Sequence, residues 1–283
     1  MKFSEDDFYK LANFVGYGQM ESDIWFVIIN EKLDQFEDIS SRLQFDQVMD
    51  RKLASTTLKK TILEFDVDNL SSEGIGISKL YLQLGKKPTK VSYAQKYMQD
   101  LLFAQTHNGL LIPFFPIPEN KDLNTNFHDV FPLFESYDKY REKVKKLRLD
   151  FFNELLEGRK PKLIFLVGAD QENVFADLFT EQNLKDHGFF QAGWDMDMVI
   201  VKINSLTELS IEQIIELSKF IHETSLPIDL NKDFGPLKLS MIELEKQKKD
   251  AAKKVAFEKR KTTSKHNASD PYCVCELCLK YDR

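Results

Sequence analysis

Cysteine is almost absent from this chain, and where it occurs it is confined to the end. All three cysteines lie between residues 273 and 278, so the body of the chain has none for a disulfide framework, as is typical of a reducing compartment. No apolar segment reaches the roughly 18 residues that a spanning helix needs, and residues 1–7 lack the pattern of a signal peptide. The sequence predicts a cytoplasmic protein without a membrane partner.

An excess of positive charge is also missing. Lys and Arg number 39 against 45 Asp and Glu, which gives a net charge of −6. This balance argues against a uniformly basic nucleic-acid-binding surface, so any contact with DNA must come from a local patch. The 23 phenylalanines are unusually many for 283 residues, and we expect most of them in the core.

Four apolar runs are typical of buried parallel strands, and helical patterns separate them. Such alternation predicts an α/β fold, a three-layer α/β/α sandwich with a short four-stranded parallel sheet. The four predicted strands are Asp23–Ile29, Gly109–Phe115, Lys162–Val167 and Met198–Ile203.

Two helices have clear signals. Residues 136–158 form a long, charged amphipathic run that ends before Pro161. Ser210 and Gln213 form a capping box ahead of a second helix with an apolar face. Residues 66–90, by contrast, contain several glycines and show weak periodicity, which predicts a surface excursion.

The composition changes near the C-terminus. Residues 238–265 are rich in lysine and prone to helix. We therefore expect an α/β domain over residues 1–225 and a helical basic C-terminal extension over residues 226–283.

The first predicted strand runs into Asn30 and Glu31. This strand and loop resemble a motif of the uracil-DNA glycosylase superfamily, in which an Asp, Glu or Asn positions the attacking water. Three further segments resemble motifs of the superfamily and occur in the same order. They are residues 110–118, the helix that contains Tyr140, Arg141 and Arg148, and residues 161–168. The resemblance spans about residues 10–224, and it implies a DNA glycosylase that acts on a flipped base.

The resemblance also implies roles for individual residues. Asn30 or Glu31 would orient the water, and Asn204, with Ser205 beside it, would bond the departing base. Phe114 or Phe115 would stack on an extruded base. The alternative is that Asn30 and Glu31 only cap a helix and that both phenylalanines belong to the core.

The sequence departs from the superfamily at three of these motifs. Ile28 and Lys32 stand where glycine is usual, and Pro113 replaces the Asn that reads a pyrimidine. Asn204 stands where a His is usual, and an amide supplies no positive charge. The expected substrate is therefore uracil or a modified pyrimidine, in DNA repair or in defence against bacteriophages with modified DNA. A non-catalytic DNA- or RNA-binding protein that keeps the fold is the alternative.

The last residues have the chemistry of a structural zinc site. Three thiolates and one imidazole are a common zinc ligand set, and two of the cysteines form a CxxC knuckle. Inert tail thiols are the alternative. An iron–sulfur cluster is not expected, because no cysteine lies in the predicted domain. The candidate ligands are His266, Cys273, Cys275 and Cys278.

The basic extension is a candidate DNA-binding element. Clustered lysines can neutralise phosphates and release counterions, although such runs are often only a solvated helix face. The candidate contacts are Lys248, Lys249, Lys253, Lys254, Lys259, Arg260 and Lys261.

Overall fold

The computed structural model describes a large part of the chain. The described residues are 2–29, 39, 42–43, 48–49, 72–104, 107–117, 127–168, 174–179, 184–195, 197–224, 226–230, 249 and 253. The chain divides into two compact units, Met1–Phe234 and Gly235–Arg283. The second unit is described only at Lys249 and Lys253, so the fold below is that of the first.

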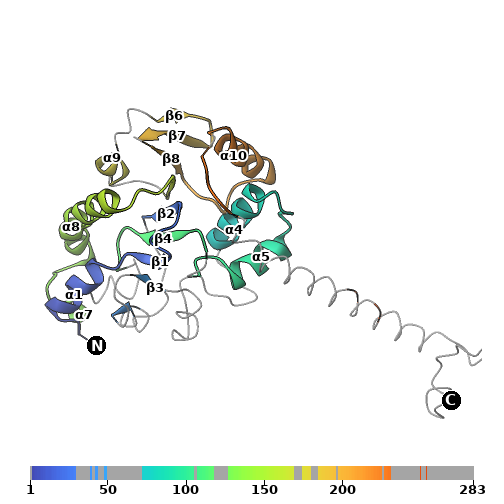
Figure 1. The fold of residues 1–283 in the computed structure, drawn as a ribbon. Coiled ribbons are helices and arrows are strands. Elements are labelled where there is room, and N and C mark those ends of the chain that lie inside the picture. Colours follow the sequence, from blue (N-terminus) through green and yellow to red (C-terminus); the bar gives the residue numbers. More distant parts are fainter. Residues whose placement is uncertain are drawn as a thin grey trace, which may run out of the picture. The chain divides into compact units, whose positions relative to one another are not determined.

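An eight-stranded sheet in the order β3-β1-β4-β2-β5-β8-β7-β6 forms the centre of this unit (Figure 1). Its middle strands β4, β2, β5 and β8 are parallel to one another, and they are the four strands that the sequence predicts. The α/β class is thus confirmed. The strands are β1 (Gly16–Gly18), β2 (Ile24–Ile28), β3 (Val48–Met49), β4 (Leu110–Pro113), β5 (Leu163–Val167), β6 (Lys185–Asp186), β7 (Phe190–Asp195) and β8 (Met198–Ile203).

The sheet is larger than the four strands expected, and it is mixed. Strand β1 pairs antiparallel with β4, and β7 pairs antiparallel with both β8 and β6. The additional strands gave little signal because β1, β3 and β6 are two or three residues long, and β7 interrupts its apolar residues with Gln191 and Gly193. Strands of two or three residues are too short to show a period, and β7 alternates apolar with polar residues or glycine, so it lacks the unbroken apolar run that marks the central strands.

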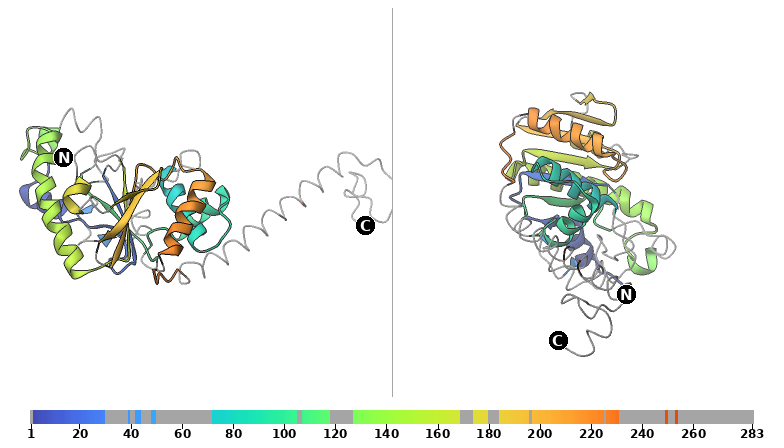
Figure 2. Two further views of the ribbon diagram at one scale, coloured as in Figure 1. Left: turned by 90° about the horizontal axis from the view of Figure 1, so that it is seen from above. Right: turned by 90° about the vertical axis from the view of Figure 1, so that its right-hand side faces the viewer.

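Helices lie on both faces of the sheet. Figure 2 shows α8 and α9 on one side and α4, α5 and α10 on the other. The described helices are α1 (Glu5–Ala12), α4 (Ser72–Leu84), α5 (Val91–Asp100), α7 (Phe127–Val130), α8 (Tyr137–Gly158), α9 (Val174–Leu178) and α10 (Ile211–Glu223).

Alternation along β2 explains why the sequence reads as an unbroken apolar run. Trp25 and Val27 belong to the core cluster that includes residues of α8. Phe26 points to the other face, where its ring lies 5.9 Å from that of Tyr81 on α4. Because successive side chains of a strand point to opposite faces, a strand covered on both sides is apolar throughout.

The prediction of a surface excursion over residues 66–90 is wrong for Ser72–Leu84, which form α4, and its residues 66–71 lie outside the described residues. Ile77, Leu80 and Tyr81 of this helix are buried. Gly76 lowered its helical signal, yet a Cβ at Gly76 would collide with the carbonyl oxygen of Leu206. The glycine therefore permits close packing of α4 on the chain after β8, and does not break the helix.

The cap signals are confirmed. The Ser210 side chain accepts a hydrogen bond from the Gln213 backbone N–H, and the Gln213 side chain accepts one from Ser210 N–H. At the start of α8 the Ser136 side chain accepts a hydrogen bond from the N–H of Lys139, without the reciprocal bond of a capping box. Within the described residues, none of the helices has the length and apolarity to cross a bilayer.

Candidate functional site

The candidate site lies at the carboxyl ends of the parallel strands. Strand β4, the parallel strand that follows β2 in the sequence, lies on one side of the β2–β5 pair. Strand β8, the parallel strand that follows β5 in the sequence, lies on the other side of this pair. The strand order therefore reverses between β2 and β5. Ligands of open α/β sheets bind in the crevice outside the carboxyl ends of the strands at such a switch point.

Backbone hydrogen bonds hold these strand ends together beyond the last paired residues. Ile29 N–H donates to the carbonyl of Val167 at 3.3 Å, and Gly168 N–H donates to that of Ile203 at 3.1 Å. Gly168 has a φ of +117°. A left-handed φ of this kind favours glycine, and a Cβ at Gly168 would lie 3.7 Å from the Cβ of Ile29, beside the end of β2.

The two residues expected to position water follow this edge in the chain. Asn30 comes immediately after Ile29, and Glu31 comes next. Both lie outside the described residues. Their predicted role therefore stays a prediction that rests on the position of Ile29 at the switch point.

Asn204 and Ser205 follow Ile203, the last residue of β8. Asn204 is exposed, which leaves its amide accessible to a ligand. The Ser205 hydroxyl lies 2.5 Å from that of Thr207 and accepts a hydrogen bond from Thr207 N–H at 3.1 Å. Ser205 thus forms a local turn, which fixes the start of the loop between β8 and α10.

The stacking role expected for Phe114 and Phe115 does not fit their positions. Both side chains are buried, with 0% and 1% of their surface exposed. Phe114 stacks on Phe152 of α8 with ring centroids 5.7 Å apart, and the two phenylalanines meet edge to face at 4.9 Å. Neither ring presents a face to a base, so the core alternative describes them.

Arg148 of α8 has a structural role that the sequence motifs did not predict. It is fully buried, and its guanidinium donates to four backbone carbonyls at 2.8–3.0 Å. Burial lowers its pKa to about 9, which leaves it protonated at neutral pH. The acceptors are the carbonyls of Ala12, Phe14, Pro113 and Phe114.

A signal for this role exists in the sequence. Tyr140, Val144, Arg148 and Phe152 are spaced four apart and share the buried face of α8. An arginine in an apolar stripe must satisfy its donors internally, so its position predicts a buried polar contact. The sequence does not identify the carbonyls that it reaches.

Two tyrosines of α8 fix the same segment after β4. The Tyr140 hydroxyl accepts a hydrogen bond from Ile117 N–H at 2.9 Å, and the Tyr137 hydroxyl donates to the Ile117 carbonyl at 3.1 Å. Burial raises the pKa of Tyr140, so it stays neutral. Together with Arg148, these side chains hold the backbone of residues 113–117, which continues the second parallel strand past the candidate site.

The expected metal and DNA-binding residues lie almost wholly outside the described part. This applies to His266 and the three cysteines, and to all the named basic residues except Lys249 and Lys253, which are exposed. Among the residues that the structure does describe, no group of three or more His, Cys, Asp or Glu side chains could hold a metal ion. The zinc and the basic contacts therefore stay predictions.

Comparison with protein-family models gives no match for this sequence, and comparison with curated proteins gives none either.

Proposed function

We propose that the protein is a DNA glycosylase that hydrolyses the N-glycosidic bond of a flipped uracil or modified pyrimidine. One observation carries the proposal. The predicted motif strands are the four central parallel strands, so their carboxyl ends lie along one edge of the sheet. Ile29, which precedes Asn30 in the sequence, and Asn204, which follows β8, lie at the edge where such folds bind ligands.

Hydrolysis of an N-glycosidic bond requires two kinds of group. A side-chain oxygen must orient water below the sugar carbon, and hydrogen-bond donors must stabilise the departing base. Asn30 or Glu31 would serve the first role and Asn204 the second. The backbone of residues 113–117, fixed by α8, would form a rigid wall. We further propose that the domain is a three-layer α/β/α sandwich, that its partner is DNA and that the protein is cytoplasmic.

The substrate follows from the departures in the motifs. Proline at position 113 has no side-chain group to read a base edge, and its carbonyl accepts a hydrogen bond from Arg148. A pocket without this reader favours a bulkier, modified pyrimidine over plain uracil. Such bases occur in the DNA of bacteriophages, which connects the proposal to antiviral defence as well as to repair.

One observation favours a non-catalytic alternative. Phe114 and Phe115 are core residues, so the aromatic platform for a flipped base must come from other residues. Without such a platform the fold would bind DNA or RNA and perform no chemistry.

The test is direct. Oligonucleotides that contain uracil, hydroxymethylcytosine or glucosylated hydroxymethylcytosine are incubated with the protein and then treated with alkali, which breaks the strand at abasic sites. Breakage at the marked position of one substrate supports the glycosylase. Binding of all substrates without breakage supports the alternative.

A further inference from the structure

The segment after α10 crosses the sheet at the amino ends of the parallel strands, opposite the edge that carries the candidate site. We call residues 226–230 (Leu-Pro-Ile-Asp-Leu) the strap. Its three aliphatic side chains are partly buried, whereas Pro227 and Asp229 between them are exposed. This alternation turns one side of an extended chain towards the protein.

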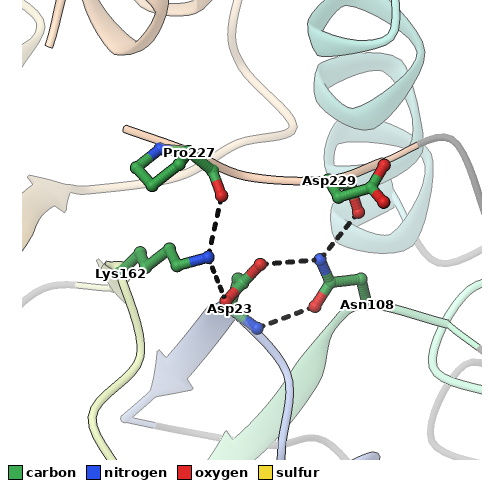
Figure 3. Close-up of polar contacts among 5 residues, drawn as sticks. All are labelled: Asp23, Asn108, Lys162, Pro227 and Asp229. Carbon is green, nitrogen blue, oxygen red and sulfur yellow. Dashed lines mark hydrogen bonds and ion pairs between the residues drawn. The ribbon is translucent and has the colours of Figure 1, made fainter. Parts of the chain in front are cut away.

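Polar side chains at the starts of three parallel strands hold the strap (Figure 3). Lys162, just before β5, donates to the Pro227 carbonyl at 2.7 Å. Asn108, just before β4, donates to the Asp229 carbonyl at 3.1 Å.

Asp23, just before β2, joins these two donors. Its carboxylate lies 3.0 Å from the Lys162 amine and accepts a hydrogen bond from the Asn108 amide at 3.3 Å. Its backbone N–H donates to the Asn108 side-chain oxygen at 2.7 Å. The strap is therefore fixed to the amino ends of the central strands, at the edge opposite the candidate site.

A cavity of about 260 Å³ lies beside the strap. The end of α4, the end of α10 and the strap itself contribute to its wall. Five aliphatic side chains line it, together with Gly85, two lysines and a histidine, and none of the lining residues carries a carboxylate. The aliphatic residues are Leu84, Ile221, Leu226, Ile228 and Leu230, and the others are Lys86, Lys87 and His222.

The way α4 ends brings both lysines to this cavity. Lys86 N–H donates to the Gln83 carbonyl, and Lys87 N–H donates to that of Leu82, which is a Schellman-type ending. Lys86 has a φ of +54°, a left-handed conformation that costs a residue with a side chain about 1 kcal/mol. Glycine would avoid this cost, yet a lysine occupies the position and supplies a charge at the cavity.

From this geometry we infer that the cavity is a binding site for a small amphipathic anion, such as a medium-chain aliphatic carboxylate. The aliphatic side chains would hold the chain, and Lys86, Lys87 and His222 would surround the charged head. An engineered cavity of about 150 Å³ already holds benzene, so the space suits a ligand of modest size.

Such a ligand would also stabilise the strap. Three of the five aliphatic lining residues belong to the strap, and a ligand that binds only the docked form stabilises that form by mass action. A bound ligand would thus hold residues 226–230 in their docked position. This inference does not depend on the glycosylase proposal.

The experiment uses sodium octanoate as the probe, with octylamine and octanol as matched compounds of opposite and no charge. Binding to the full chain is measured by calorimetry, and cleavage of the strap by limited proteolysis. Octanoate should bind more tightly than both other compounds and should slow cleavage at residues 226–230. Equal binding of octylamine, or octanoate binding without protection of the strap, would overturn the inference.

Two variants and a control complete the test. Lys86→Glu reverses a charge at the rim and should weaken octanoate binding on the order of tenfold. Leu226→Trp should fill the cavity and abolish binding. Lys146→Glu makes the same charge change on the exposed face of α8 and should bind octanoate as the wild type does. If Lys86→Glu behaves like Lys146→Glu, the lysines only complement the C-terminal dipole of α4, and there is no anion site.

Discussion

Arg148 donates a hydrogen bond through Nε to the carbonyl oxygen of Phe114 at 3.0 Å, which ties α8 to the residue that follows β4. The same guanidinium reaches Ala12 and Phe14 between α1 and β1. A single buried charge thus joins the N-terminal segment, the second parallel strand and the helix that covers them. Because one guanidinium donates to four backbone carbonyls, its loss should be costly.

Arg148→Met should lower the free energy of unfolding by on the order of 3 kcal/mol or more, because each buried carbonyl left without a donor costs about 1–3 kcal/mol. Urea denaturation followed by circular dichroism measures the change. Lys146→Met, on the exposed side of the same helix, is the control and should stay within about 0.5 kcal/mol of the wild type. A similar small loss for Arg148→Met would show that water or other groups replace the guanidinium.

The central strands could be predicted from the sequence because they are buried on both faces and therefore apolar almost throughout, with Lys202 of β8 as the charged exception. The end of β8 agrees to the residue, and Ser210 caps α10 as its spacing indicates. Helix α4 could not be predicted in this way. Its glycines lower helix propensity, and only the close approach of Leu206 to Gly76 explains why one of them is there.

The candidate site was less predictable than the fold. Sequence order places Asn204 after β8, and the structure leaves its side chain exposed. For Phe114 and Phe115, however, a motif cannot distinguish a ring that faces a pocket from one that packs under a helix. That distinction depends on Phe152, which is distant in the sequence.

Asp7 should make the first helix sensitive to acid. Its carboxylate accepts hydrogen bonds from the Ser4 N–H at 2.9 Å and the Ser4 hydroxyl at 2.7 Å, and these bonds lower its pKa below the usual 3.8. Because the pKa is lower in the folded state, the stabilisation is complete above about pH 4 and is lost as the pH falls through the lowered value.

Asp7→Asn should therefore destabilise the protein by a few tenths of a kcal/mol at pH 7, and the difference from the wild type should vanish at low pH. Thermal unfolding at a series of pH values measures it. Asp6→Asn, in the same turn of α1, is the matched control. A difference for Asp7→Asn that is independent of pH would mean that the charge of the carboxylate plays no part.

The thiols near the C-terminus should bind metal. Elemental analysis of the purified protein should find about one zinc per chain, because three thiolates and one imidazole complete a tetrahedral site. Changing both Cys275 and Cys278 to Ser should abolish the zinc. Protein that is free of metal and unchanged in circular dichroism on addition of zinc would refute the site.

The basic extension should give DNA binding a steep dependence on salt. Each phosphate neutralised by a lysine releases counterions, with a log–log slope of roughly −0.7 to −0.9 per contact. Truncation after Pro236 should flatten this slope and weaken binding to all sequences about equally, because phosphate contacts carry no sequence information. If the truncated chain binds as tightly as the whole chain between roughly 50 and 200 mM salt, the extension is only a solvated helix.

The most direct measurement is single-turnover cleavage by Asn30→Ala and Glu31→Ala, with the oligonucleotide that the wild type converts to an abasic product. The account predicts that at least one variant loses on the order of 10²-fold or more in the chemical step while its DNA affinity stays nearly unchanged. Lys146→Ala on α8 should react at the wild-type rate. Full activity in both Asn30→Ala and Glu31→Ala would contradict a catalytic site at the end of β2.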